Sequence, residues 1–395
     1  MREVAPKGRG YLIVNSHPEG CAAVVDRMWQ AITPREDGSA PTVLLLGASA
    51  GYGLAVLLAG LRRHGIRGVG VAYEAPETER RTASAGWYRT AAAAALAAEN
   101  GNDFTFVNAD AFGADAKASV LDLVAAQYGP VDHLVYSLAA PRRTDPRTGT
   151  VHHSVIKPLG EAYEAPSLEF TDDIAKVGSV RLPPATEDER EATTKVMGGE
   201  DWALWVEALA GRGLLADGFT TVALSYVGSE LTAPVYRQGT IGAAKEHLEQ
   251  TAATLNDTVL SGGTGRAFTV VAGAAVTQAS TAIPSIALYT SLLRGVLGED
   301  FRSTDRQAVE LWEQLTGAEP LVLDGQGRIR LDGWEMDEAV QQRVRALWAD
   351  PEAALEADTS GTRWFLEQVR ALYGWDVPGV DYGRPVETTV TWPSA

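Results

Sequence analysis

The feature of this sequence that most limits its fold is an alternation of short apolar runs with longer stretches of helical periodicity. The apolar runs are rich in Val, Leu, Ala and Phe, and they are Val43–Leu46, Val69–Tyr73, Phe104–Asn108, His133–Ser137, Thr221–Tyr226 and Phe268–Ala272. The helical patterns between them are Gly53–Arg63, Gly86–Glu99, Ala116–Gln127 and Ile241–Leu255. Strands that are apolar on both sides belong to a sheet covered by helices on both faces. An α/β fold with a doubly wound parallel sheet is therefore predicted.

A glycine-rich turn follows the first apolar run. It reads Gly47-Ala48-Ser49-Ala50-Gly51-Tyr52-Gly53 and leads into the helical pattern. Glycines at such a turn let the backbone approach a diphosphate, whose charge meets the exposed amides and the positive dipole end of the helix. The spacing GxxxGxG is typical of Rossmann-like folds of the short-chain dehydrogenase type. Between a strand and a helix it predicts a dinucleotide site, with a purely structural turn as the alternative.

The second apolar run ends at Tyr73-Glu74, where Rossmann-like proteins read the adenosine ribose. A carboxylate at this position accepts hydrogen bonds from both ribose hydroxyls and repels the additional phosphate of NADP. Glu74 therefore favours NADH as the cofactor. Arg80 and Arg81 follow closely in the sequence and leave NADPH as the less favoured alternative.

Two further strand ends are candidate cofactor contacts. Asp110-Ala111 follows the third run, where a carboxylate and a backbone amide hold the adenine in such folds. Leu138-Ala139 follows the fourth run, where the backbone nears the nicotinamide ribose. At each place, plain termination of a strand is the alternative interpretation.

A tyrosine and a lysine after the fifth run are the candidate catalytic pair. Tyr236 and Lys245 are nine positions apart, which at about 100° per residue places them on opposite faces of one regular helix. We therefore expect Tyr236 in a loop loosened by Gly239 and Gly242, and Lys245 in the helix that follows. A phenol hydroxyl stabilises a developing oxyanion, and an ammonium group holds ribose hydroxyls and lowers the pKa of a neighbouring phenol.

Other interpretations of this pair stay open. In the first, Tyr236 packs in the core and Lys245 lies on the surface of a helix, and neither residue has a catalytic function. A ketoreductase or alcohol dehydrogenase also uses Tyr and Lys, but its usual YxxxK spacing is absent after the fifth run. A non-catalytic dinucleotide-sensing protein would keep the fold without the chemistry.

Composition excludes several classes of partner. The formal net charge of -17 repels nucleic acid and anionic membranes as general partners, although a substrate with phosphates would need a local basic patch. Cys21 is the single cysteine, so no intramolecular disulfide can form, and a cytoplasmic location is expected. Cys21 itself is interpreted as a small buried hydrophobe. The stretch Phe268–Leu293 is interrupted by polar residues and Pro284, so it is predicted to be core and not a membrane span.

The chain is predicted to be a single enlarged domain, 1–395. Its Rossmann core comprises 40–140 and 219–295. An inserted helical substrate region covers 141–218, where Trp202 and Trp205 recur at helical spacing and are interpreted as core residues. A C-terminal helical cover spans 296–395, with an amphipathic pattern at Met336–Trp348.

The whole pattern resembles a known family, the FabV-type trans-2-enoyl-CoA (enoyl-acyl carrier protein) reductases, which are enlarged relatives of short-chain dehydrogenases. The resemblance covers nearly the full chain. It is carried by the segments GRGYLIVNSHPEGC, GASAGYGLA, TASAGWYRTAA, VYSLAAP, KVMGGEDWALWVEAL, YRQGTIGAAK, VTQASTAIP, GRIRLDGWEM and GVDY. Tyr-(eight residues)-Lys and MGGEDW are the most specific of these motifs.

The resemblance implies reduction of the C2–C3 double bond of a trans-2-enoyl thioester, on coenzyme A or acyl carrier protein, with NADH as the reductant. Hydride adds to C3, the tyrosine stabilises the enolate oxygen, and C2 is protonated. The family is generally monomeric and metal-free, and no HExxH or CxxC spacing occurs here.

The resemblance also assigns roles to residues of this sequence. Tyr226 is the expected substrate-binding residue and a rival proton donor, Tyr236 is the expected proton donor, and Lys245 is the expected cofactor-binding lysine. The expected contacts of NADH are Gly47, Ala48, Ser49, Ala50, Gly51, Tyr52, Tyr73, Glu74, Asp110, Ala111, Leu138, Ala139, Lys245, Ala275, Val276 and Thr277.

Three departures from the family pattern bear on specificity. Ala75 stands where the family usually has a lysine after the ribose-reading glutamate. The segment Ala272-Gly273-Ala274-Ala275 is smaller than usual, which suggests room for a branched or bulkier acyl chain. The tail VETTVTWPSA is unlike the family.

Overall fold

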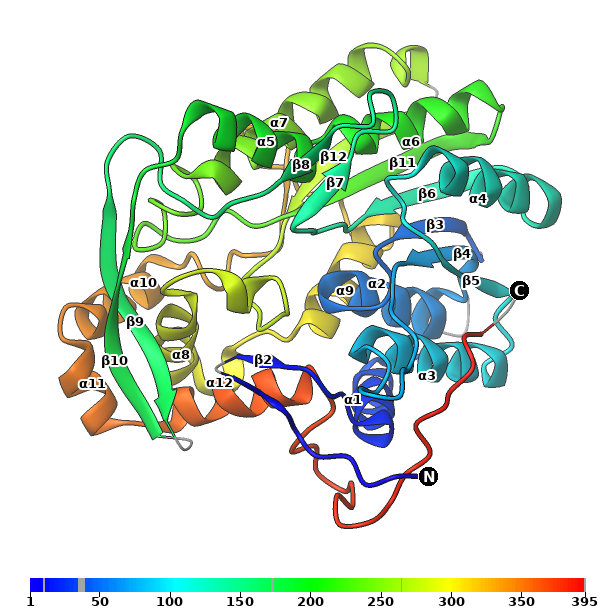
Figure 1. Cartoon of the computed structure of the whole chain (residues 1–395). Coiled ribbons are helices and arrows are strands. Elements are labelled where there is room, and N and C mark those ends of the chain that lie inside the picture. Colours follow the sequence, from blue (N-terminus) through cyan, green and yellow to red (C-terminus); the bar gives the residue numbers. More distant parts are fainter. Residues whose placement is uncertain (10, 35–39, 172–173, 264, 394–395) are drawn as a thin grey trace.

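A computed structural model of the chain describes residues 1–9, 11–34, 40–171, 174–263 and 265–393. Its centre is a seven-stranded sheet in the order β13-β12-β11-β6-β3-β4-β5, and all neighbouring strands are parallel. The strands are β3 (Thr42–Leu46), β4 (Arg67–Ala72), β5 (Phe104–Asn108), β6 (Val131–Tyr136), β11 (Leu215–Ser225), β12 (Gly265–Val271) and β13 (Ile329–Arg330). Figure 1 shows this sheet with helices on both sides, which confirms the predicted doubly wound α/β fold.

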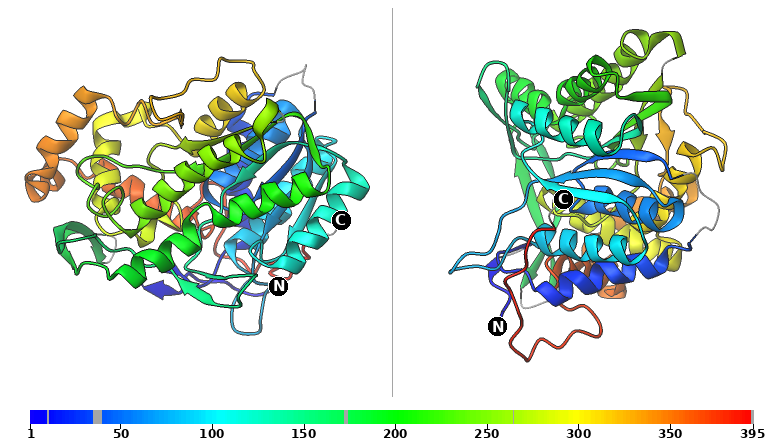
Figure 2. Two further views of the ribbon diagram at one scale, coloured as in Figure 1. Left: turned by 90° about the horizontal axis from the view of Figure 1, so that it is seen from above. Right: turned by 90° about the vertical axis from the view of Figure 1, so that its right-hand side faces the viewer.

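Each face of the sheet has its own layer of helices, because side chains alternate along a strand. Leu45 of β3 packs with α1 (Pro18–Ala31), α2 (Gly51–Ala59), α3 (Ala85–Glu99) and α9 (Thr304–Leu315). Leu44 and Leu46 pack on the other side with α4 (Ala114–Gln127), α6 (Glu200–Gly211) and α7 (Thr240–Asp257). The two layers appear on either side of the sheet when the molecule is turned (Figure 2). Trp202 and Trp205 are fully buried in the second layer and Cys21 is fully buried as well, so all three are core residues as predicted.

The strand order reverses between β3 and β6. From β3 the chain proceeds outward through β4 to β5, then returns so that β6 pairs with β3 on its other side, with Leu46 opposite Tyr136. In open α/β sheets, ligands bind beyond the carboxyl ends of the strands at such a reversal. The fold therefore places its principal cleft at the segments that follow Leu46 and Tyr136.

The region 141–218 differs from the helical insertion that was expected. Besides α5 (Glu187–Met197) and α6, it contains two antiparallel hairpins, β7 (Arg142–Thr144) with β8 (Val151–His153), and β9 (Tyr163–Thr171) with β10 (Ile174–Leu182). In β9 and β10, Leu168, Phe170, Ala175 and Val177 pack on the helices of the C-terminal region, with a charged residue between the members of each pair. This period of two is the pattern of a half-buried strand, and the polar composition of the segment concealed it.

The C-terminal region 296–395 is also not purely a helical cover. After α8 (Ile286–Leu297) and α9, the chain adds β13 to the sheet edge and then forms α10 (Glu338–Trp348), α11 (Pro351–Ala357) and α12 (Ser360–Ala371). Figure 1 shows α8, α10, α11 and α12 gathered beside the β9–β10 hairpin. Among the described residues, no helix has both the length and the apolar character needed to cross a membrane.

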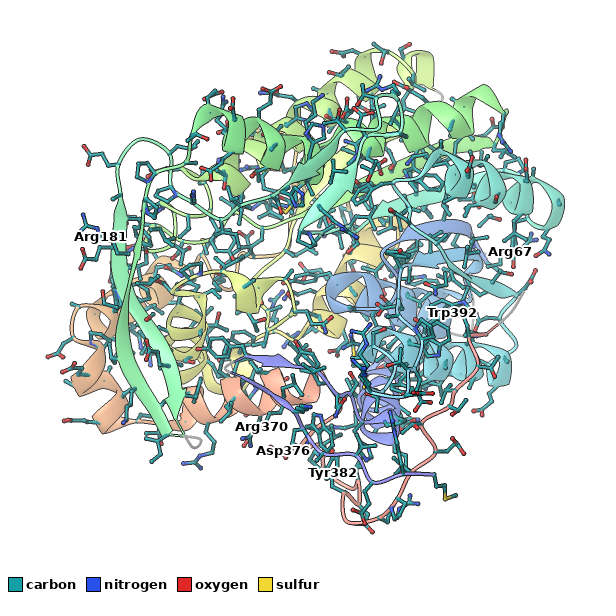
Figure 3. The ribbon with its side chains drawn as sticks, in the orientation of Figure 1. Arg67, Arg181, Arg370, Asp376, Tyr382 and Trp392 are labelled. Atoms are coloured by element: carbon teal, nitrogen blue, oxygen red, sulfur yellow. The ribbon has the colours of Figure 1, made fainter. Side chains whose placement is uncertain are left out.

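The tail after α12 returns to the opposite edge of the sheet. The ion pair between Arg370 and Asp376 marks its start, and Figure 3 shows Trp392 at the far end of its path. The Trp392 indole N–H donates to the carbonyl oxygen of Phe106 in β5 (3.0 Å), and the Trp87 indole N–H donates to that of Val390 (2.8 Å). Trp392 thus covers part of an exposed strand edge, a place that invites unwanted pairing. Ser394 and Ala395 of this tail lie outside the described residues.

Candidate active site

The glycine turn after β3 has the geometry that close approach of a ligand requires. Gly47 and Gly51 have φ values of +91° and +53°, which residues with a Cβ rarely adopt. A Cβ on Gly53 would lie 1.9 Å from the Gly47 carbonyl oxygen, so the first turn of α2 packs directly on the loop. Ala50 precedes α2 and provides no side-chain cap, which leaves the first amides of the helix for an anion. These residues fit a dinucleotide diphosphate.

A cavity of about 660 Å³ opens at this turn, beyond the carboxyl ends of β3 to β6. The predicted cofactor residues that line it are Gly47, Ser49, Ala50, Gly51, Tyr52, Tyr73, Glu74, Asp110, Ala111, Leu138, Ala139 and Thr277. We call it the dinucleotide cavity. Ala48 is 1% exposed and packs into the core beneath the turn, and Val276 lines a different cavity between α1, α9 and α12. The structure therefore does not place these two side chains in the dinucleotide cavity.

Glu74 is held by two serines. Ser49 Oγ donates to its Oε1 (2.6 Å), and Ser84 Oγ donates to its Oε2 (2.5 Å). A Cβ on Gly86 would lie 1.9 Å from Glu74 Oε1, so the first turn of α3 has a glycine where the carboxylate needs space. Each carboxylate oxygen keeps further lone pairs for a ribose hydroxyl.

A second cavity of about 560 Å³ adjoins the first. It shares Tyr52, Ser137–Pro141 and Thr277–Ala279 with the dinucleotide cavity. Its other lining is mainly apolar and includes Ile156, Met197, Leu224, Ile241, Ile283 and Ile286. Tyr226, Tyr236, Lys245 and Ala275 also line this second space, which we call the acyl cavity.

Tyr236 and Lys245 occupy the positions that their spacing predicted. Tyr236 lies in a turn before α7, where its N–H donates to the Thr232 carbonyl oxygen (3.0 Å), and Lys245 lies within the helix. A Cβ on Gly242 would lie 2.3 Å from the Tyr236 carbonyl oxygen, so this loop folds back closely on the first turn of α7. Burial lowers the pKa of Lys245 to about 8. Burial, and then the charge of Glu335, raise the pKa of Tyr236.

Tyr226 lies directly after β11 and contacts both Tyr236 and a carboxyl group. The two aromatic rings meet edge to face, with their centroids 4.7 Å apart. The Tyr226 hydroxyl donates to Glu335 Oε1 (2.7 Å). The sequence predicts no role for Glu335, although its segment GRIRLDGWEM is one of those that carry the family resemblance. An acid in a GWEM sequence gives no sign that it is buried among tyrosines far away in the chain.

The MGGEDW motif supports the Asp110-Ala111 end of the dinucleotide cavity. Asp201 accepts a hydrogen bond from Lys117 Nζ (2.6 Å), and the same ammonium group donates to the carbonyl oxygens of Ala111 (2.7 Å) and Phe112 (3.2 Å). The Trp205 indole N–H also donates to Ala111 (3.2 Å). These contacts fix the turn that was predicted to hold adenine.

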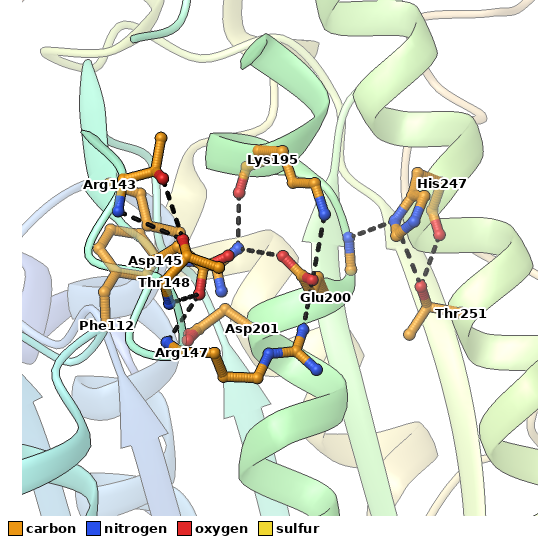
Figure 4. A network of polar contacts seen from close by, with 12 residues as sticks. Phe112, Arg143, Asp145, Arg147, Thr148, Lys195, Glu200, Asp201, His247 and Thr251 are labelled. Carbon is orange, nitrogen blue, oxygen red and sulfur yellow. Dashed lines mark hydrogen bonds and ion pairs between the residues drawn. The ribbon is translucent and has the colours of Figure 1, made fainter. Parts of the chain in front are cut away.

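The neighbouring glutamate of the motif anchors the start of α6. Figure 4 shows Glu200 surrounded by Arg143, Arg147 and Lys195, at distances of 2.8, 2.5 and 3.2 Å. Beside them, His247 Nδ1 accepts the Gly199 amide hydrogen (2.9 Å). The motif therefore connects β7, α5, α6 and α7, and its Asp201 links it through Lys117 to a turn that lines the dinucleotide cavity.

The parallel sheet, the glycine turn and the adjoining cavity with a buried tyrosine and a partly buried lysine define a dinucleotide-dependent oxidoreductase of the Rossmann-like class. Comparison with family models is more specific. The model described as "Trans-2-enoyl-CoA reductase catalytic region" matches residues 81–316, and "NAD(P)H binding domain of trans-2-enoyl-CoA reductase" matches residues 3–79. A model described as "Enoyl reductase FAD binding domain" matches residues 323–386. The chain belongs to the trans-2-enoyl-CoA reductase family.

Individual relatives agree over the full length. An enoyl-[acyl-carrier-protein] reductase [NADH] of Streptomyces avermitilis is 54% identical, over 99% of this chain and all of the relative. A protein with the same name from Pseudoalteromonas atlantica is 41% identical, over 98% and 99%. The trans-2-enoyl-CoA reductase of Treponema denticola, solved in complex with NAD, is 36% identical, with a TM-score of 0.91 over 97% of this chain and 98% of that one. The Clostridium enzyme of the same name, solved with NADH, is 34% identical, with a TM-score of 0.91 over 98% of both chains.

Proposed function

We propose that this chain uses NADH to reduce the C2–C3 double bond of trans-2-enoyl thioesters carried on coenzyme A or on acyl carrier protein. The observation that carries the proposal is the junction of the two cavities. A dinucleotide and an apolar acyl chain can meet at Ser137–Pro141 and Thr277–Ala279, beside Tyr236 and Lys245. Family membership supports the same reaction.

Different residues of the dinucleotide cavity would bind different parts of the cofactor. The Gly47–Tyr52 turn and the first amides of α2 would hold the diphosphate, Glu74 the adenosine ribose, and Asp110-Ala111 the adenine. Leu138-Ala139 and Lys245 would face the nicotinamide end. Bound NADH supplies a hydride for C3 of the substrate. Residues 323–386, which match the model named for FAD, line neither the dinucleotide cavity nor the acyl cavity within the described structure.

Tyr236 and Lys245 would act on the thioester side of the reaction. Because burial raises the pKa of Tyr236, its phenol keeps its hydrogen at neutral pH and can donate it to the thioester oxygen as negative charge develops there. Lys245 would hold the nicotinamide ribose as an ammonium. Tyr226 already donates its hydroxyl hydrogen to Glu335, which supports Tyr236 as the donor to substrate.

The acyl cavity bears on chain preference. Gly273 gives no free space, because a Cβ there would lie 2.5 Å from the Trp334 ring, and Ala272 is buried in the core. Ala274 and Ala275 do line the cavity. We infer that these two small side chains admit a branched acyl chain.

We further propose that the protein acts as a monomer in the cytoplasm.

One panel of rate measurements tests the proposal. Loss of NADH absorbance is followed with linear and branched trans-2-enoyl-CoA substrates of matched length, with an enoyl-acyl carrier protein beside them. We expect turnover that depends on the double bond and is faster with NADH than with NADPH. NADH binding without reduction of any enoyl thioester would overturn the proposal in favour of a dinucleotide-sensing protein.

A further inference from the structure

Glu335 is a fully buried carboxyl group behind the acyl cavity. It lies in the turn between β13 and α10, where its amide N–H donates to the Asp332 carbonyl oxygen (2.9 Å). A buried carboxyl group is costly unless hydrogen bonds compensate for the loss of water. The role of Glu335 therefore depends on which groups donate hydrogen bonds to it.

Three donors from three different elements converge on this one carboxyl group. Oε1 accepts from the hydroxyls of Tyr226 (2.7 Å), after β11, and Tyr289 (2.8 Å), on α8. Oε2 accepts from the Ala274 amide (2.5 Å), after β12. Gln341 of α10 donates to the Glu335 carbonyl oxygen (2.7 Å) and to the Tyr289 hydroxyl (3.1 Å). Glu335 therefore joins the C-terminal region to two segments that line the acyl cavity.

We propose that Glu335 is a positioning residue, which holds Tyr226 against Tyr236 and so keeps the Tyr236 hydroxyl available to the substrate. This inference rests on the proposed function. Glu335 fixes the Tyr226 ring at its hydroxyl. The Tyr226 ring then packs edge to face against the Tyr236 ring, with the two ring centroids 4.7 Å apart. Because the Tyr226 hydroxyl donates its hydrogen to Glu335, the Tyr236 hydroxyl is the one left to donate to the substrate.

The charge of Glu335 decides how many donors it can accept. Burial raises its pKa to about 7, against the opposing effect of the bonds from Tyr226, Tyr289 and Ala274, and Asp332 raises it further. The other titratable groups facing it are Tyr52 and Tyr236. Above about pH 7 the carboxylate accepts from both tyrosine hydroxyls. Below that pH one carboxyl oxygen carries a hydrogen, and the donors facing that oxygen, either the Ala274 amide or the two tyrosine hydroxyls, lose the charged acceptor.

The decisive variant is Glu335→Gln, measured in the full chain with NADH and an enoyl-CoA that the wild type reduces. An amide keeps the size of the side chain, but its NH₂ group cannot accept one of the three hydrogen bonds. We expect kcat to fall about 10- to 100-fold, from the loss of a hydrogen bond to a charged group, with little change in the KM for NADH. The dependence of kcat on pH near 7 should disappear. Glu338→Gln, on the exposed side of α10, is the matched control and should behave as wild type.

The outcomes separate this inference from the proposed function. If the wild type reduces enoyl thioesters and Glu335→Gln keeps both its kcat and its pH profile, the positioning role is wrong. If the wild type reduces none, the proposed function fails first. Should Glu335→Gln not fold, Tyr226→Phe decides, because it removes the same contact from the other side. Its kcat must then lose the same dependence on pH near 7, and an unchanged profile overturns the role.

Discussion

Tyr226 and Tyr236 share a wall of the acyl cavity, but the fold treats their hydroxyls differently. Tyr226 donates to a carboxyl group, and Tyr236 lies ahead of α7 with its ring buried and its pKa raised. Replacement of Tyr236 by Phe should therefore lower kcat by about 100- to 1000-fold, the typical loss when one oxyanion donor is removed. NADH affinity, measured by fluorescence of the reduced nicotinamide, should stay within a factor of about two.

Tyr226→Phe is the comparison that assigns the proton donor. It removes a hydroxyl that points to Glu335, so its kcat should fall less than that of Tyr236→Phe. A larger loss in Tyr226→Phe would exchange the two roles. The two variants differ from wild type by one oxygen each, which keeps the packing of the rings comparable.

Lys245 gives the site a second dependence on pH. Burial of its ammonium group disfavours the charged form and lowers its pKa to about 8. The charged form, which we propose holds the ribose hydroxyls, is therefore complete at pH 6 and is lost as the pH rises through about 8. We expect kcat/KM to fall above that pH, and a profile measured up to about pH 10 should show the descending limb.

A matched pair of variants tests whether titration of Lys245 causes the descending limb of the pH profile. Lys245→Met should remove it together with most of the activity. Glu246→Gln changes a charge on the exposed side of the same helix and should leave the limb in place. A descending limb that persists in Lys245→Met would assign the titration to another group.

Among the elements, those with local sequence signals were predictable and those defined by distant contacts were not. Six of the seven strands of the central sheet and the glycine turn follow from runs of apolar residues and from spacing, and the structure places them where the sequence indicated. The exception is β13, which has only two residues and no apolar run. The loop position of Tyr236 followed from helical geometry alone. The β9–β10 hairpin was missed because its alternation is short and its outer face is charged. The contact between Tyr226 and Glu335 spans 109 positions, and no local pattern encodes a contact of that kind.

The start of α6 is connected to the lining of the dinucleotide cavity through a lysine of α4. Lys117 of α4 connects Asp201 of α6 to the carbonyl oxygens of Ala111 and Phe112. Lys117→Met leaves Asp201 buried without its ion-pair partner, which typically costs about 3–5 kcal/mol of unfolding free energy. It also removes the ammonium contacts to the turn predicted to hold adenine and leaves the Trp205 bond to Ala111, so the KM for NADH should rise while kcat changes little.

The double variant separates these two effects. In Lys117→Met combined with Asp201→Asn, no buried charge is left alone, so denaturant unfolding should show a smaller loss of stability than in Lys117→Met. The KM for NADH should remain high, because the ammonium group that donates to both Ala111 and Phe112 is still missing. Recovery of both properties would mean that Lys117 supports the fold and not the cofactor site.

At the scale of the whole molecule, the dinucleotide cavity is built from segments that lie far apart in the chain. Its walls come from Gly47–Tyr52, Tyr73-Glu74, Asp110-Ala111, Ser137–Arg142 and Thr277–Ala279. None of these segments makes the site alone, so a ligand bound among them is bound only by the folded chain. Cofactor binding should therefore stabilise the entire molecule, and the gain depends only on concentration and affinity.

Thermal unfolding with each cofactor tests both the site and its selectivity. At 100 times its Kd, a ligand adds about 2.7 kcal/mol to the free energy of unfolding. With an unfolding entropy of about 2.1 cal/mol/K per residue, NADH should raise the Tm of a chain of this length by roughly 3 °C. NADPH at the same concentration should raise it less, because the Glu74 carboxylate, held in place by Ser49 and Ser84, repels the additional phosphate. Glu74→Ala should reduce the difference between the Tm increases that NADH and NADPH produce. Equal Tm increases in the wild type would show that Glu74 does not read the ribose.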